Sequence, residues 1–335
     1  MKFARCSLRA PTSGYHVAIV GAGPAGLAAA GELACRGHDV HVFDKLPEPG
    51  GMLIFAIPDF RFRKNLVRSG IRELEKLGVT FKKTEVDGKM IQRMLDDYDA
   101  VLLATGAWRN VKLGIKGEDL PGVYYGLDWM FNYMFHLLGY GPPPPATGEK
   151  TIVIGAGLTG LDVCEVLYRN CGVKPILVYR RPLKVAPAAV ALSRLAEKGI
   201  IQVVDSTLPI EVVGSRRVEG LKVVRTEAIS DRSAPVKPIP GTEHVIEADT
   251  VIVSAGLLPS PPPFLKELGV ALERDYRIQV DEKFMTNVKG LFAAGDVIHG
   301  ASNVAKAMES GKLAAIEIDN FLKQGDWRSS EFNTP

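Results

Sequence analysis

Two glycine-rich segments have the residue spacing that holds the pyrophosphate of a dinucleotide. Residues 21–26 read Gly-Ala-Gly-Pro-Ala-Gly, and residues 155–160 read Gly-Ala-Gly-Leu-Thr-Gly. In this pattern the first glycine permits a tight turn, the second lets backbone amides approach the phosphates, and the third lets the next helix pack close to the strand. That helix directs its positive N-terminal end at the phosphates. Each segment therefore predicts a dinucleotide-binding loop.

The elements that must position the first loop are present on both of its sides. The apolar residues 15–20 predict a buried strand, and the small residues 27–36 predict a helix. A second strand at 39–43 ends at Asp44, about 20 residues after the loop, where a carboxylate can accept hydrogen bonds from a ribose diol. Loop, strand and acid together predict a bound dinucleotide.

The second loop has the same surroundings but a different residue after its second strand. A strand is expected at 151–154, a helix at 161–170 and the second strand at 175–179, which leads into Arg180 and Arg181. A carboxylate would repel a ribose 2′-phosphate, whereas a guanidinium pairs with it bidentately. We therefore predict that this loop binds NADPH, with NADH less favoured. The alternative is an exposed basic pair without a ligand.

Three further segments resemble motifs of the flavoproteins that contain two dinucleotide-binding domains. They read Pro-Gly-Gly-Met at 49–52, Leu-Leu-Ala-Thr-Gly at 102–106 and Gly-Leu-Phe-Ala-Ala-Gly-Asp at 290–296. By this resemblance the Gly-Gly pair lies against the flavin side of FAD, and Asp296 bonds the ribitol. The helix expected over 302–321 would point its N-terminus at the flavin pyrimidine ring, where its dipole stabilises the reduced flavin. Residues 251–256 mirror the turn at 104–106, which indicates an internal duplication.

The residues around these motifs resemble a narrower family over about residues 14–325. The matching segments are residues 49–61, 103–108, 117–123 and 178–181. They are similar to the glutamate synthase small (beta) subunit, the large subunit of NADPH-dependent ferredoxin oxidoreductase and the flavin region of dihydropyrimidine dehydrogenase. In that family hydride passes from NAD(P)H to FAD, and electrons then leave singly through iron–sulfur clusters.

The sequence departs from the family pattern in two respects. It begins about a dozen residues before the first strand, so we expect it to lack the family's N-terminal iron–sulfur domain. Leu158 stands where family members more often have Asn, and Phe55-Ala56 stands where Tyr-Gly is common.

The expected fold class is α/β, with two Rossmann-like domains and the NADPH domain inserted into the FAD domain. The expected parts are an N-terminal arm at 1–13, an FAD domain at 14–115 and 263–325, an NAD(P)H domain at 116–262 and a C-terminal tail at 326–335.

The resemblance and the motifs together give the expected cofactor contacts. For FAD they are Gly21, Gly23, Pro24, Ala25, Gly26, Asp44, Lys45, Gly51, Met52, Arg61, Val86, Ala104, Thr105, Gly106, Gly295, Asp296, Asn303 and Val304. For NAD(P)H they are Gly155, Gly157, Leu158, Thr159, Arg180, Arg181, Ala255 and Gly256. No catalytic side chain and no metal are expected, because hydride transfer takes place at flavin N5.

Composition excludes several other classes of protein. The chain has 335 residues, enough for two domains, and its 41 Lys+Arg against 38 Asp+Glu give a net charge of +3, with no electrostatic sign of nucleic-acid binding. No apolar run is long enough to span a membrane. The four cysteines lack the spacing for zinc or an iron–sulfur cluster, and Cys164 and Cys171 are too far apart on one helix to pair. We expect reduced thiols and a cytoplasmic setting.

The predicted function is an FAD-dependent NAD(P)H oxidoreductase subunit. Its expected partner is an iron–sulfur protein or a ferredoxin in a hetero-oligomer. One alternative is a stand-alone ferredoxin, quinone or dye reductase, and another is a non-catalytic FAD- and NADPH-binding assembly or sensor protein. The basic arm with Lys2, Arg5 and Arg9 is either part of a docking surface or a disordered terminus.

Overall fold

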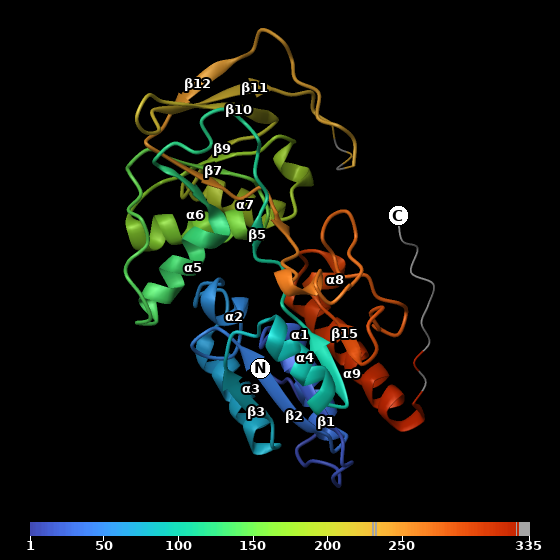
Figure 1. Cartoon of the computed structure of the whole chain (residues 1–335). Coiled ribbons are helices and arrows are strands. Elements are labelled where there is room, and N and C mark those ends of the chain that lie inside the picture. The colour runs from blue at the N-terminus through green and yellow to red at the C-terminus, as the bar shows by residue number, and fades with distance from the viewer. Residues whose placement is uncertain (230, 232, 326, 328–335) are drawn as a thin grey trace. The chain divides into compact units, whose positions relative to one another are not determined.

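A computed structural model describes the chain except for residues 230, 232, 326 and 328–335. The chain forms two compact units, one of residues 1–109 together with the chain from 257 onward, and one of residues 110–256 (Figure 1). The expected domain boundaries, after residues 115 and 262, lie a few residues further along the chain. Of the expected tail, all residues but Trp327 lie outside the described part.

The first unit is built on a parallel five-stranded sheet in the order β15-β4-β1-β2-β3. Its strands are β1 (His16–Val20), β2 (Asp39–Asp44), β3 (Thr80–Lys83), β4 (Ala100–Leu103) and β15 (Leu291–Ala293). Its helices are α1 (Pro24–Cys35), α2 (Met52–Phe55), α3 (Lys64–Lys76), α4 (Gly88–Asp97), η2 (Pro263–Leu265), α8 (Asp296–His299) and α9 (Val304–Gln324). The central strands β1 and β4 are almost wholly buried, as a parallel sheet covered on both faces requires.

Helices α1 and α9 pack closely, and a buried ionic network joins their C-terminal parts. A Cβ at Gly311 of α9 would lie only 2.7 Å from the carbonyl carbon of Ala25, so the two backbones nearly touch. Asp319 of α9 accepts a hydrogen bond from His38 Nε2 (2.8 Å) and pairs with Arg36 (2.5 Å). Burial alone would raise the pKa of Asp319, but the hydrogen bonds from its cationic neighbours hold that pKa below its ordinary value.

The second unit repeats the parallel sheet, in the order β6-β13-β7-β8-β9. Its strands are β6 (Val123–Tyr125), β7 (Thr151–Ile154), β8 (Ile176–Val178), β9 (Gln202–Val204) and β13 (Thr250–Val253), and an antiparallel sheet contains β10 (Thr207–Val213), β11 (Gly220–Arg225) and β12 (His244–Glu247). Its helices are α5 (Gly126–Leu137), α6 (Leu158–Cys171), η1 (Leu183–Val185) and α7 (Ala189–Glu197). Val153 packs with the helices, whereas Ile152 and Ile154 pack with the antiparallel sheet, so β7 is covered on both faces.

The two parallel sheets have equivalent strand orders. In each, the strand before the glycine loop is central. In the first sheet β1 lies between β2 and β4, and in the second sheet β7 lies between β8 and β13. The chain passes from one unit to the other at β5 (Arg109–Asn110) and at β14 (Leu257–Leu258), and these two short strands pair with each other. The predicted α/β fold with two Rossmann-like domains is confirmed. Within the described part of the chain, no helix is long and apolar enough to cross a membrane.

The N-terminal arm, residues 1–13, packs on the first unit. Phe3 is 1% exposed, and neither Gly31 of α1 nor Gly70 of α3 has room for a Cβ, because Phe3 and Met1 lie against them. The terminal ammonium donates to the Leu66 carbonyl at 2.9 Å. The alternative of a disordered terminus is therefore wrong.

The expectation of reduced thiols is wrong for one pair of cysteines. Cys6 of the arm forms a disulfide with Cys35, the last residue of α1, across a sequence separation of 29. The path of the arm brings the two residues together, and no local spacing signals that path. Cys164 and Cys171, as predicted, do not pair.

Candidate functional site

The first glycine loop lies at the carboxyl end of β1, between β2 and β4. Gly21 has φ +109°, and its N–H donates to the Phe43 carbonyl at 2.8 Å. A Cβ at Gly21 would collide with the Ala104 carbonyl, and one at Gly26 would collide with the Gly21 carbonyl. A Cβ at Gly23, in contrast, would meet no protein atom within 4 Å. Packing thus requires glycine at positions 21 and 26. The middle glycine, Gly23, leaves open space at the N-terminus of α1 that fits a pyrophosphate.

The second loop reproduces this geometry at the carboxyl end of β7. Gly155 has φ +111° and donates to the Val178 carbonyl at 2.9 Å. A Cβ there would collide with the Ser254 carbonyl, and one at Gly160 would collide with the Gly155 carbonyl. Gly157 again faces open space. The residues of this loop also fit a dinucleotide pyrophosphate.

The turn motifs that follow β4 and β13 border the two loops. The Ala104 N–H donates to the Val20 carbonyl at 2.8 Å, and the Ser254 N–H donates to the Ile154 carbonyl at 2.7 Å. In the first unit Thr105 and Gly106 continue the turn. In the second unit Ala255 and Gly256 continue it and are exposed. Each predicted turn therefore lies beside its own glycine loop.

The Gly50-Gly51 turn lies against the first loop. The Gly50 N–H donates to the Ala22 carbonyl at 2.8 Å, and a Cβ at Gly51 would lie 2.9 Å from the Gly23 Cα. Met52 then begins α2. The buried Lys64 was not predicted. Its Nζ donates to the Leu53 carbonyl at 2.6 Å and also to the Ile57 carbonyl, so it fixes the backbone of α2 and of the residues that follow it. Its chain neighbours are Arg63 and Asn65, so no local signal in the sequence distinguishes it from an exposed basic residue.

Asp44 turns toward the first loop. Its Oδ2 accepts from the Ala22 N–H at 2.6 Å and its Oδ1 from the Leu46 N–H at 2.8 Å. Burial raises the pKa of this carboxyl. Each oxygen keeps a further lone pair for a ribose hydroxyl. Nearby, Lys45 is exposed and pairs with Glu85 at 3.3 Å, and Val86 packs into the core of the unit.

The C-terminal motif meets the start of α1. A Cβ at Gly295 would lie 2.7 Å from the Ala25 Cβ, and the Gly295 N–H donates to Ser310 Oγ at 2.9 Å. Asp296 Oδ1 accepts from Ser302 Oγ at 2.6 Å, and burial raises the pKa of Asp296. Ser302, Ser310 and Gly311 were not predicted, although a Ser-Gly pair inside a helix is a signal of close packing.

Four of the residues expected to contact FAD lie at the edges of this region. Asn303 caps α9 by accepting from the Lys306 N–H at 3.0 Å, and Val304 is the first residue of that helix. Arg61 is exposed in the segment between α2 and α3, and Pro24 opens α1. The structure thus gathers most of the predicted FAD residues around the N-terminal ends of α1 and α9.

Arg180 and Arg181, although adjacent in the chain, have different surroundings. Arg180 is exposed just after β8. Arg181 is buried, and its Nη2 donates to the Ala234 carbonyl at 2.7 Å, while its Nε has no hydrogen-bond partner among the described residues. Of the pair, Arg180 is therefore the side chain available to a phosphate. Leu158 at the start of α6 is 53% exposed.

Two Rossmann-like units with a glycine loop in each define a two-dinucleotide-domain oxidoreductase. The chain belongs to the pyridine nucleotide-disulphide oxidoreductase family, whose model matches residues 15–311. It is 34% identical over 319 residues to the glutamate synthase [NADPH] small chain of Halomonas elongata, covering 91% of this chain and 68% of that protein. It is 36% identical over 335 residues to the beta subunit of NADP(+)-dependent formate dehydrogenase from Moorella thermoacetica, covering 94% of this chain and 45% of that protein.

Among solved structures, the chain is similar to Mycobacterium tuberculosis FprA in complex with NADPH. The TM-score is 0.79 at 21% identity, covering 94% of this chain and 86% of FprA, which establishes the fold. The predicted resemblance to glutamate synthase small subunits is confirmed, as is the prediction of an NAD(P)H-dependent flavoprotein oxidoreductase. Membership in this family supports FAD and NADPH as the cofactors.

Proposed function

We propose that the chain is the electron-input subunit of a larger enzyme, with FAD in the first unit and NADPH in the second. The observation that carries the proposal is the contrast between two loops of similar backbone geometry, one followed by half-buried Asp44 and the other by exposed Arg180. The chemistry that bound FAD supplies is to accept a hydride and to release electrons one at a time.

In the first unit, the residues hold and orient the dinucleotide. The open space at Gly23 admits the pyrophosphate, and Asp44, fixed by two backbone N–H groups, receives the ribose diol. Gly51 and Met52 shape the flavin side. Asp296, fixed by Ser302, receives the ribitol.

In the second unit, the residues select NADPH. Gly157 admits the pyrophosphate, and Arg180 pairs with the 2′-phosphate. Arg181 acts indirectly, because its hydrogen bond to Ala234 holds the loop that follows β11. The two arginines therefore have different functions.

The names of the relatives support a separate electron acceptor. The Halomonas relative is a small chain and the Moorella relative a beta subunit, so each works within a larger enzyme. We propose an iron–sulfur protein or a ferredoxin as the partner, in a hetero-oligomer. The cytoplasmic location stays a prediction. The Cys6–Cys35 disulfide argues against it, because stable disulfides are uncommon in reducing compartments.

The test is steady-state reduction by the isolated, FAD-loaded chain, with NADPH as donor. We expect fast reduction of an artificial dye and negligible reduction of small metabolites, because the dye replaces the protein partner. Efficient reduction of a metabolite would support a stand-alone reductase instead. A chain that binds FAD and NADPH without reducing any dye would support the non-catalytic alternative.

A further inference from the structure

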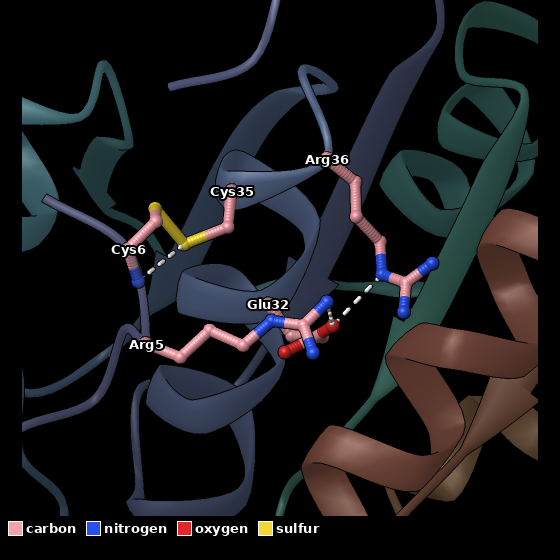
Figure 2. Close-up of a disulfide and its surroundings, with 5 residues drawn as sticks. All are labelled: Arg5, Cys6, Glu32, Cys35 and Arg36. Carbon is pink, nitrogen blue, oxygen red and sulfur yellow. Dashed lines mark hydrogen bonds and ion pairs between the residues drawn. A yellow bond between two sulfur atoms is a disulfide. The ribbon is translucent and has the colours of Figure 1, made fainter. Parts of the chain in front are cut away.

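The N-terminal arm is tied covalently to the helix that carries the first glycine loop. Figure 2 shows the disulfide between Cys6 and Cys35, whose Cα atoms are 5.7 Å apart, at the last turn of α1. The Cys6 N–H donates to Cys35 Sγ at 3.2 Å. The bond lies at the opposite end of α1 from Gly23, so it is far from the pyrophosphate site along the helix.

Two kinds of non-covalent contact also hold the arm. Phe3 packs against Gly31 of α1 and Gly70 of α3, and Arg9 Nη2 donates to the Gly37 carbonyl at 3.0 Å. Arg5 pairs with Glu32 of α1 at 2.9 Å, and Arg36 approaches the same carboxylate from the other side at 2.8 Å (Figure 2). The Arg5 side chain is 64% exposed, so its pair is weak by itself.

The disulfide is within reach of a reagent in solution. Cys6 and Cys35 are both partly exposed, and the neighbouring Leu8 is 83% exposed. Cys164, in contrast, is buried, and burial raises the pKa of its thiol well above the ordinary range. Cys171 is exposed but unpaired. The chain therefore offers one exchangeable pair and one exposed thiol that serves as an internal reference.

We propose that Cys6–Cys35 is a thiol-exchange site at which a dithiol reductant releases the arm from α1. One thiolate of the reductant attacks a sulfur of the pair, forms a mixed disulfide and expels the other cysteine as a thiolate, which takes a proton from water. The second reductant thiolate then attacks the mixed disulfide and expels the remaining cysteine. The protein gains two electrons and two protons, and the reductant leaves as a disulfide.

The redox state of this pair determines how the arm behaves. In the oxidised chain the crosslink keeps Phe3 packed between α1 and α3 and holds Lys2, Arg5 and Arg9 on the first unit. In the reduced chain one buried aromatic and a few hydrogen bonds remain, so the arm opens more often. Opening releases Arg5 and Arg9 from their partners on the first unit and uncovers the surface of α1 and α3.

The first test equilibrates the folded full chain with a redox reagent, quenches exchange with acid, and then counts all thiols by alkylation in denaturant and mass measurement, because Cys164 is buried in the folded chain. After equilibration with oxidised dithiothreitol, we expect the two thiols of Cys164 and Cys171 alone to be present. After equilibration with reduced dithiothreitol without denaturant, we expect four. A thiol count that does not change between the two conditions would overturn the exchange site.

The second test follows the arm by hydrogen exchange and by trypsin cleavage after Arg9. We expect amides of residues 1–13 to exchange at least about tenfold faster in the reduced chain. Cys6→Ser and Cys35→Ser should show the fast exchange under both conditions, and the matched control Cys171→Ser should respond to reductant like the unaltered chain. Equal exchange in the oxidised and reduced chains would show a passive crosslink and contradict the proposal. Chemical reduction keeps the test valid if a serine variant fails to fold.

Discussion

The two glycine loops have nearly the same backbone and different side chains after their second strands. In both, the outer glycines are confined by carbonyl oxygens of their own unit, while the middle glycine faces open space. In the first unit Asp44 folds back and accepts the Ala22 N–H. In the second unit Arg180 extends into solvent. Packing therefore fixes the loop, and we propose that the residue at the end of the second strand selects the ligand.

The two units also differ in how a second helix supports the loop. In the first unit α9 has 21 residues and packs against α1, and Asp319 fixes it near its C-terminal end. In the second unit α5 has 12 residues, and its first residue, Gly126, lies against Ser254. The first unit thus has an additional anchor at the buried Asp319.

The largest expected effect comes from the helix-packing glycines. Gly26→Ala and Gly160→Ala each place a Cβ against a carbonyl oxygen, so each should lower the free energy of unfolding by about 3 kcal/mol. Gly26→Ala should abolish FAD retention, and Gly160→Ala should abolish NADPH binding. Denaturant unfolding and cofactor titration of both variants measure these effects.

Matched controls are Gly23→Ala and Gly157→Ala, whose new methyl groups meet no protein atom. They should change the free energy of unfolding by less than about 0.5 kcal/mol and still weaken binding of their own dinucleotide. If they bind both cofactors normally, the open spaces are not the pyrophosphate sites.

The next effect tests the extra anchor of the first unit. Asp319→Asn should lower the free energy of unfolding by about 2 kcal/mol at neutral pH, because Arg36 and Lys323 lose the charged acceptor with which they pair. The pKa of Asp319 is lowered from 3.8 in the folded chain, so its contribution is complete above that value and is lost as pH falls through the folded pKa. Stability curves of the two proteins should therefore converge at low pH. A pH-independent difference would contradict this assignment.

A smaller effect separates the two arginines of the second unit. Arg180→Ala should raise the Kd for NADPH by roughly 10- to 150-fold and leave that for NADH nearly unchanged. Arg181→Ala should alter both nucleotides equally, since Arg181 bonds a protein carbonyl. Calorimetric titration with each nucleotide tests the pair. Equal losses for NADPH and NADH in Arg180→Ala would remove the assignment of the 2′-phosphate site.

The strands and loops could be predicted because their signals are local. The apolar runs that form β1 and β7 end directly in glycine loops, and Asp44 is the last residue of β2. The inward turn of Arg181 could not be predicted, because it depends on the position of a distant loop. The same holds for the Cys6–Cys35 pair, which depends on the tertiary path of the arm.

The most direct test of the central claim is anaerobic titration of the FAD-loaded chain with NADPH, followed by the visible absorption of the flavin. We predict one FAD per chain, full bleaching by one NADPH, slower bleaching by NADH, and loss of that preference in Arg180→Ala. A chain that stays colourless after incubation with FAD, or a flavin that NADPH does not bleach, would contradict the account.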